Sequence, residues 1–492
     1  MFRHLSCHPY FMRRFTVWAI LMASAAPAQA PAPLKLGTVT VQGSVRSRLE
    51  AWNWFEPDSG DPSYAFLGML ARLGFSRNHK TLDWQIEFAA PILLGLPDNA
   101  TAPGSQGELG LGATYFNANK RNRNAAMIFP KQVFMRFKGL MGDPRHNLRL
   151  GRFDFADGSE LAPKNATLAT IKRDRITMRL IGPFNFTHVF RGFDGFHWTY
   201  DEPGANFTFV GAVPTRGVFQ VDGWGWNKVA FAYGAYTKSW GRGRHAVDTR
   251  VFGMLYDDWR PINKTDNRSL IRRTDTGEIR TMTFGAHSLH AFETSSGVAD
   301  LLLWGAVQAG RWGSLDHRAH AFAIEAGFQP KIAPKLKPWF RGGFYDGSGD
   351  KDPADSKHGT FFQMLPTPRF FARFPFFNMM NNRDINGFVI LRPHAKLTLS
   401  SEFHALSLSN RNDLWYLGGG AFQPRAFGFA GRNAGGRGPL ANLWDTNAEI
   451  RLRPNITVNA FIGYAQARAA AKFVYPRSTH GALGLLEWNY RF

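Results

Sequence analysis

Apolar and polar residues alternate along most of the chain with a period of two. The final segment, residues 486–492, alternates strictly between large apolar side chains and Glu, Asn and Arg. Residues 82–90 repeat the pattern, with Leu, Trp, Ile and Phe between Asp, Gln and Glu. Successive side chains of a β-strand point to opposite faces, so each segment predicts a strand with one apolar and one polar face.

The same pattern recurs down the whole chain, with no helix-period segments between its repeats. It predicts an all-β fold of about eighteen strands. The expected strands are residues 39–55, 64–76, 82–90, 132–140, 147–154, 190–200, 205–212, 227–238, 245–256, 281–293, 301–310, 318–329, 336–346, 385–392, 396–407, 442–453, 456–466 and 481–492.

The connections between these strands alternate short and long. Short ones carry Gly, Pro, Asn and Asp, which favour tight turns, whereas the long ones span about 97–126, 156–189, 258–279, 347–384, 409–441 and 467–480. Bacterial outer-membrane barrels have short periplasmic turns and long extracellular loops. The sequence therefore predicts one transmembrane antiparallel β-barrel over residues 39–492, with the last strand closing against the first.

The N-terminus has the features of a targeting segment. Arg13 and Arg14 precede an apolar run that ends in small residues, which predicts a signal peptide over residues 1–28, with cleavage after residue 30 as an alternative. Translation could start at either Met1 or Met12. The only cysteine, Cys7, lies in this segment, so the mature chain would have no thiol nucleophile or thiolate metal site. We expect Sec-type export to the bacterial outer membrane.

The formal net charge of +22 indicates an anionic partner. An exported chain with this strand pattern excludes nucleic acid, which leaves an anionic solute, or outer-membrane lipid and lipopolysaccharide. A lipid-facing Arg costs roughly 2–4 kcal/mol at the bilayer midplane, so strand cations should point inward. The polar faces carry Arg46, Arg48, Arg72, Arg136, Lys138, Arg341, Lys396 and Arg451, with Glu50, Asp83, Glu87, Glu325, Glu402 and Glu449. Such an interior is either a salt-bridge network that braces the wall or a cationic pore.

One stretch, SGDKDPADSKHGTFFQMLPTPRFFARFPF at residues 348–376, resembles the bacterial alginate-export family of outer-membrane porins. ILRPHAKLTLSSEFHAL (390–406), NDLWYLGGGAF (412–422), FGFAGR (427–432) and GRFDFADG (151–158) extend the resemblance. It implies an eighteen-stranded barrel with an arginine-lined constriction, through which an acidic polysaccharide such as alginate leaves the cell passively. The candidate pore-lining or substrate residues are Arg46, Arg48, Glu50, Arg72, Arg136, Arg152, Arg341, Arg369, Arg373, Lys396 and Arg451, with Arg369 and Arg373 expected near the pore mouth.

Other functions remain open at this point. A general anion-uptake porin, a barrel hydrolase built on His404, and a surface-binding barrel with long loops each fit part of the pattern. No Gly-x-Ser-x-Gly elbow supports the hydrolase. The aspartates of residues 350–355 lack the spacing of an EF-hand, and we expect no cofactor, metal or catalytic residue. We also expect Trp52, Trp54, Trp198, Trp339 and Trp488 to lie in interfacial girdles, and Phe492 to engage the barrel-insertion machinery.

Overall fold

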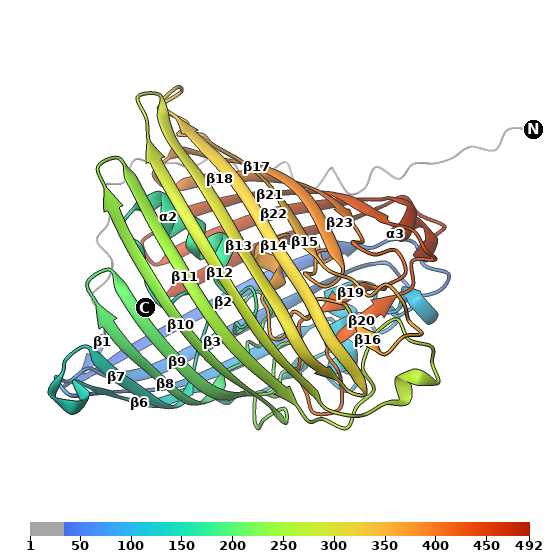
Figure 1. Ribbon diagram of the computed structural model, residues 1–492, viewed down its shortest axis with the longest axis horizontal. Coiled ribbons are helices and arrows are strands. Elements are labelled where there is room, and N and C mark those ends of the chain that lie inside the picture. The colour runs from blue at the N-terminus through green and yellow to red at the C-terminus, as the bar shows by residue number, and fades with distance from the viewer. Residues whose placement is uncertain (1–33) are drawn as a thin grey trace, which may run out of the picture.

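The computed structural model describes residues 34–492, which form a closed barrel (Figure 1). The predicted signal peptide, with Cys7 and Met12, lies outside the described residues. None of the helices within residues 34–492 is long and apolar enough to cross a membrane.

Eighteen antiparallel strands make the wall, as the sequence pattern predicts. They are β2 (Val39–Asn53), β3 (Ser63–Arg77), β4 (Leu82–Leu94), β6 (Phe129–Lys138), β7 (His146–Phe153), β8 (Phe193–Glu202), β9 (Ala205–Pro214), β10 (Val229–Arg242), β11 (His245–Asp258), β12 (Ile279–Glu293), β13 (Gly297–Trp312), β14 (Leu315–Pro330), β15 (Trp339–Gly347), β17 (Asn382–His394), β18 (Leu397–Ser407), β21 (Pro439–Arg453), β22 (Ile456–Ala467) and β23 (His480–Arg491).

The wall closes where β23 pairs with β2, which confirms the predicted contact between the last strand and the first. Arg48 lies opposite Glu487 in this register, and Leu49 lies opposite Leu486. The aliphatic pair faces outward, because Leu49 and Leu486 are each nearly half exposed. Arg48 of the charged pair is buried and faces the interior. The period-two pattern thus separates a lipid-facing belt from a polar interior.

The tryptophans correct one expectation. Trp52, Trp54 and Trp339 are almost completely buried inside the barrel rather than at its outer interfaces. Trp52 stacks on Tyr64, and the Trp339 indole N–H donates to Asp300 at 2.8 Å. Their positions near strand ends were right, but strand parity turns them inward, where the indole finds a polar partner.

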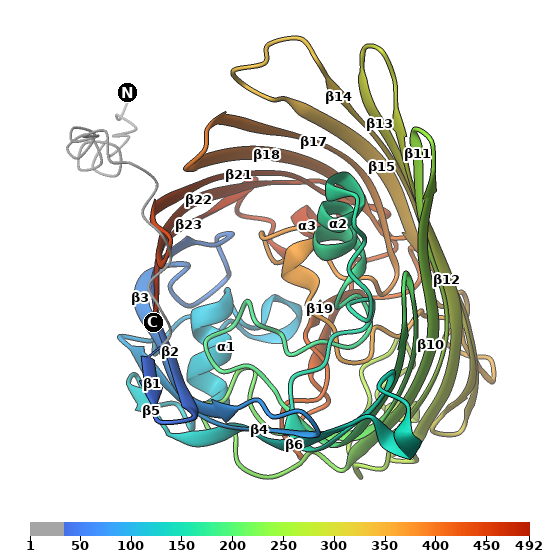
Figure 2. The ribbon, with the colours of Figure 1, turned by 90° about the vertical axis from the view of Figure 1, so that its left-hand side faces the viewer.

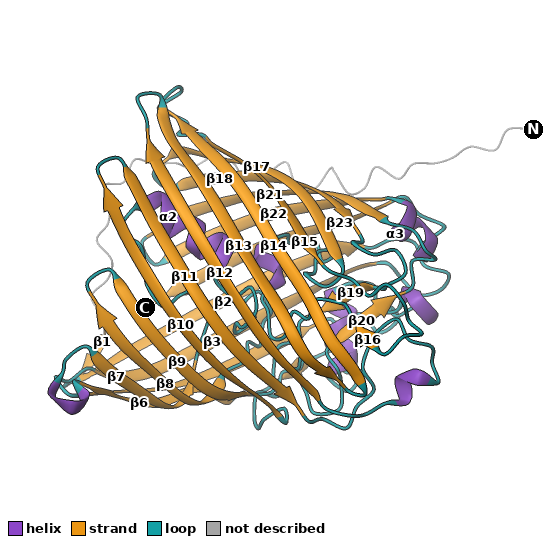
Figure 3. Ribbon diagram, in the orientation of Figure 1, coloured by secondary structure: helices purple, strands orange, loops and turns teal. Residues whose placement is uncertain are grey.

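Long loops fold back into the barrel instead of all remaining outside it. The β4–β6 loop (residues 95–128) carries α1 (Leu111–Ala118), and the β7–β8 loop (residues 154–192) carries α2 (Ala166–Ile171) and the π-turn Lys172–Ile176. The view along the barrel in Figure 2 shows these helices and neighbouring loops inside the wall, and Figure 3 shows that the interior segments are mainly helix and loop. The smaller elements are β1 (Leu34–Leu36), β5 (Ala125–Ala126), β16 (Lys357–His358), β19 (Trp415–Gly418), β20 (Phe429–Arg432), α3 (Ala469–Val474) and the 3-10 turns Gly104–Gln106, Leu140–Gly142, Arg272–Thr274 and Pro368–Phe370.

The phenylalanine-rich part of the β15–β17 loop (residues 348–381) is part of this interior filling. Phe361, Phe362, Phe371, Phe374, Phe376 and Phe377 are all at most 2% exposed. Phe376 packs edge-on to Trp415 of β19, with ring centroids 4.5 Å apart. The run therefore packs this loop into the barrel.

Candidate functional site: a basic cavity inside the barrel

Two cavities lie inside the wall. The larger, about 730 Å³, lies among the periplasmic halves of β2, β15, β17, β18, β21, β22 and β23, whereas the smaller, about 600 Å³, lies among segments from the extracellular side. Phe186, Arg369 and Arg373 line both cavities. These three residues therefore form a partition between a periplasmic chamber and an extracellular one.

The periplasmic chamber is rich in arginine. Nine arginines and five acidic residues line it. The arginines are Arg46, Arg48, Arg173, Arg175, Arg341, Arg369, Arg373, Arg392 and Arg491, and the acids are Asp174, Glu402, Asp445, Glu449 and Glu487. Guanidinium groups hold their charge at any physiological pH and match carboxylates with paired donors, and they outnumber the acidic side chains on the surface of this chamber.

Arg46 and Arg48 bind the β7–β8 loop to the wall. Arg46 donates to the carbonyls of Asn185 (2.7 Å) and Thr187, and Arg48 donates to that of Phe186 at 2.9 Å. Both arginines thus fix the loop that supplies one side of the partition. Sequence reasoning assigned them to the pore wall, and the geometry adds that they position a loop.

Glu50 supplies a buried negative charge next to Arg48. Its carboxylate accepts from Arg48 at 2.6 Å and contacts His188 Nε2 at 3.2 Å, and it has no exposed side-chain surface. Burial lowers the pKa of His188 to about 3, so this loop histidine is neutral. Gly68 on β3 faces the His188 ring, and any Cβ there would clash with it. Glu50 is therefore a partner of Arg48 and contributes no surface to either cavity.

A second arginine cluster crosses from the β7–β8 loop to the opposite wall. Glu325 on β14 accepts from Arg175 at 2.7 Å and from Arg341 at 3.2 Å, and Arg341 also pairs with Asp300 at 3.3 Å. Burial lowers the pKa of Arg179, in the same loop, to about 10. Arg179 Nη2 also lies 3.7 Å from Glu325, so three arginines share this carboxylate and cations outnumber acidic groups in the cluster.

Arg369 and Arg373 correct the predicted placement near the pore mouth. The guanidinium of Arg369 donates to the carbonyls of Phe374 (2.9 Å) and Phe377 (2.7 Å), which holds the β15–β17 loop in a compact turn. Arg373 reaches Asn447 Oδ1 at 2.6 Å on the wall strand β21. Both residues lie inside the barrel, because the loop that carries them folds inward.

The other predicted residues lie away from the two cavities. Arg72 pairs with Glu87, Arg136 with Asp83 and Arg152 with Asp194, so these inward pairs brace the wall. Lys396 lies in the turn between β17 and β18, and Arg451 is exposed near the periplasmic end of β21. Neither lines a cavity.

Three arginines of the chamber were missed by sequence reasoning. Arg173 and Arg175 belong to the Lys-Arg-Asp-Arg run in a loop, where strand parity says nothing, and Arg392 lies at the end of β17. Arg392 has no ion-pair partner within residues 34–492 and lies 5.8 Å from the Trp339 ring centroid. The sequence signal that could have identified Arg173 and Arg175 is the basic run at residues 172–175, which places three cations close together in a long loop.

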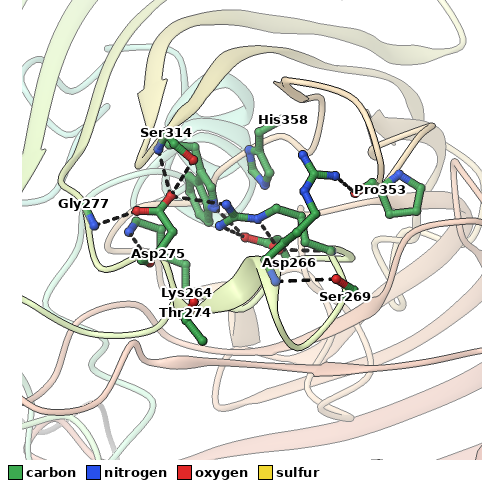
Figure 4. Close-up of polar contacts among 12 residues, drawn as sticks. Lys264, Asp266, Ser269, Thr274, Asp275, Gly277, Ser314, Pro353 and His358 are labelled. Atoms are coloured by element: carbon green, nitrogen blue, oxygen red, sulfur yellow. Dashed lines mark hydrogen bonds and ion pairs between the residues drawn. The ribbon is translucent and has the colours of Figure 1, made fainter.

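The extracellular β11–β12 loop (residues 259–278) is held rigidly to its neighbours (Figure 4). Asp275 accepts from the backbone and side chain of Ser314, and Arg268 bridges Asp266 and Asp275. Hydrogen bonds to backbone N–H groups, opposing the effect of burial, hold the pKa of Asp275 well below its usual range. These contacts fix the β11–β12 loop at the extracellular rim of the barrel.

The alternative sites have less support. His404 is buried between Asp384 (2.9 Å) and Glu402 (3.7 Å), in a wall ion cluster. Within residues 34–492 no group of three or more side chains is placed to hold a metal ion. Asp350 is buried, and its backbone N–H donates to Asp413 at 2.8 Å.

Solved structures place this architecture among outer-membrane porins. Acinetobacter baumannii OccAB2 aligns with a TM-score of 0.55 at 10% identity, covering 93% of this chain and 99% of that one. Pseudomonas aeruginosa OccK9 (OpdG) aligns at 0.54 and 10% identity, covering 92% and 98%. Pseudomonas aeruginosa OpdK with vanillate aligns at 0.51 and 10% identity, covering 92% and 98%. These likenesses show the fold: an outer-membrane porin barrel.

The family model "Alginate export" matches residues 106–465. The chain therefore belongs to the alginate-export family of outer-membrane channels, in agreement with the resemblance seen in its motifs. No curated protein sequence matches the chain.

Proposed function

We propose that the barrel is a passive channel with a cationic interior that exports an acidic polysaccharide, of the polyuronate class that includes alginate. The observation that carries the proposal is the periplasmic chamber, in which arginines outnumber acidic side chains by nine to five. The family match supports the export of such a polymer. The solute would enter from the periplasm, where the chamber opens between the short-turn ends of the strands.

Transfer would proceed by exchange between weak sites. Fixed guanidinium groups replace water around a carboxylate, and several shallow sites in series let the solute both bind and leave. Arg373, Arg392 and Arg491 have no acidic side-chain partner within the described residues, so their charge is available to a solute. The spacing of carboxylates along a polyuronate suits a chain of such sites.

Passage requires the partition to open. Phe186, Arg369 and Arg373 separate the two chambers. Phe186 belongs to the β7–β8 loop, and the two arginines belong to the β15–β17 loop. A chain of linked sugars needs a continuous path, so the β7–β8 and β15–β17 loops would separate during export. Loop contacts are weaker than the strand ladder, and motions of this kind occur on microsecond to millisecond timescales.

A second function is uptake of small carboxylates. Each chamber is large enough for a single-ring molecule, and a related barrel, Pseudomonas aeruginosa OpdK, has been solved with vanillate. Here the loops would stay largely closed and a small anion would pass alone. The two functions differ in whether oligouronates enter the channel.

Charge reversal at the unpaired arginines tests the cationic channel. Arg373→Glu with Arg392→Glu should reduce the anion-to-cation permeability ratio at least several-fold in planar bilayers, because two fixed cations of the periplasmic chamber become anions. Arg77→Glu with Arg242→Glu is the matched control, since both residues lie on the outer face at periplasmic strand ends. An unchanged reversal potential in the first variant would show that the solute path avoids this chamber.

A further inference from the structure

On the outer face of β21, β22 and β23, the chemical character of the side chains changes stepwise from the extracellular rim toward the middle of the membrane. Its rim is α3 and the loop beside it, where Arg437, Arg468 and Lys472 are exposed and form no ion pair within residues 34–492. Arg468 is the N-cap residue of α3, and Lys472 lies four residues later in the same short helix. Neither cation has an acidic partner within the described residues, so an anion placed beside them would be stabilised.

Below this basic rim the outward side chains become neutral and polar. Arg468 donates to Asn442 Oδ1 at 3.3 Å, and Asn442 donates to Gln466 Oε1 at 3.3 Å. His480 of the adjacent strand stacks on Tyr464, with ring centroids 6.0 Å apart. These groups form a layer of donors and acceptors between charge and hydrocarbon.

The next outward pair is aromatic. Trp444 and Tyr464 lie opposite each other in the register of β21 and β22, and each is about two-fifths exposed. Aromatic residues of this kind mark the boundary between headgroups and hydrocarbon in outer-membrane barrels. The basic rim therefore lies at the level of the outer-leaflet headgroups.

The belt below the aromatic pair is hollowed. Small or short side chains, including Ser401, Thr446, Ala448 and Ala460, leave a depression of about 320 Å³ on the lipid-facing wall of β17, β18, β21 and β22. Ala448 lies six positions after Asn442 on β21, which is about 20 Å along the strand. A fatty acyl chain that starts at the amide layer is long enough to reach this hollow.

We propose that this face binds lipopolysaccharide through its lipid A, a phosphorylated and acylated diglucosamine. The phosphate would lie among Arg437, Arg468 and Lys472, the sugar against Asn442 and Gln466, and one acyl chain in the hollow. Charge and shape both select this lipid, because it places an anionic headgroup at the extracellular surface of the outer membrane. The site is on the outside of the barrel, so it is independent of the proposed solute path.

Native mass spectrometry of the full chain in detergent, with bisphosphorylated lipid A added, tests the proposal. Arg468→Ser with Lys472→Ser should retain at least fivefold less lipid A than the unmodified protein. Arg77→Ser with Arg242→Ser, which removes two outward cations at the periplasmic ends, should retain the same amount. Equal retention by the first variant and the unmodified protein would overturn the site, as would equal retention of dephosphorylated lipid A.

The hollow has its own test. Ala448→Leu with Ala460→Leu fills it and should lower retention of lipid A, whereas Ala286→Leu with Ala309→Leu adds the same volume elsewhere on the lipid face and should not. Heat-modifiable migration on gels shows whether each variant is folded. Loss of a dimer or trimer mass in the Arg468 and Lys472 variant, with lipid A retention unchanged, would show that a second copy of the chain covers this face instead.

Discussion

Individual arginines in this barrel have two distinct roles. Arg48, with 3% of its side chain exposed, neutralises a fully buried Glu50 and holds the Phe186 carbonyl. Arg136 pairs with Asp83 but keeps 40% of its side chain in solvent. Both groups of the first pair are buried, whereas the guanidinium of the second pair is partly exposed to solvent. This difference decides what each arginine contributes to stability.

Substitution of Arg48 should therefore be far more damaging than substitution of Arg136. Arg48→Ala leaves Glu50 buried without its cation, which costs about 3–5 kcal/mol. Arg136→Ala removes a partly exposed guanidinium and leaves Asp83 paired with Lys138 at 2.7 Å, so it should cost only roughly 0–1 kcal/mol. Urea unfolding of the two variants in detergent measures both losses. Equal losses would mean that solvent reaches Glu50 and that the loop contact with Arg48 is not formed.

At the scale of elements, two inward loops are linked by a buried carboxyl group. Asp413 in the β18–β21 loop (residues 408–438) accepts from the backbone N–H of Asp350 at 2.8 Å and from Leu414 at 2.7 Å. Burial raises the pKa of Asp413 to about 6, and burial raises that of Asp350 to about 6. Both loops lie outside the membrane-spanning strands.

This link should weaken as the pH rises. A carboxyl group whose folded pKa lies above its unfolded value of 3.8 stabilises the contact fully below that value and loses this stabilisation as pH passes about 6. The protection factors of the Asp350 and Leu414 amides should fall between pH 4.5 and 7.5, by up to roughly a hundredfold for a two-unit shift. Asp413→Asn should flatten this dependence, and a profile that remains unchanged in that variant would assign it to another group.

The β15–β17 loop supplies two of the three residues of the partition, Arg369 and Arg373. Arg369 gathers the carbonyls of the β15–β17 loop into a compact turn, so replacement of residues 370–377 by a short glycine-serine linker should open the path between the chambers. Single-channel conductance should rise about twofold or more with the sign of selectivity kept, since most of the arginines stay in place. Shortening the exposed segment 120–123 is the control and should leave conductance unchanged; equal effects would show that the loop does not obstruct the path.

The wall could be predicted from the sequence because its determinant is local. Period-two alternation in segments such as residues 82–90 and 486–492 fixes both the strand and the face of each side chain, and all eighteen strands were anticipated within a few residues. The interior loops were not, because no periodicity tells whether Arg173 or Arg373 turns inward. That depends on contacts between residues far apart in the sequence, such as Arg46 with Asn185 and Arg373 with Asn447.

At the scale of the whole molecule, charge is sorted by location. Paired cations such as Arg152 brace the wall, unpaired ones such as Arg392 line the periplasmic chamber, and others such as Arg468 lie at the outer rim. The cations of the described residues are thus divided among the wall, the periplasmic chamber and the outer rim. Only those of the chamber belong to the proposed solute path.

Single-channel recording of the unmodified protein in planar bilayers, under a salt gradient and with oligouronates added to the periplasmic side, tests the proposed channel most directly. We expect a reversal potential of the sign set by anion preference, and a concentration-dependent block by oligouronates that neutral oligosaccharides of the same length do not cause. Cation preference would contradict the cationic channel, and anion preference with no block by oligouronates would contradict the export of an acidic polysaccharide.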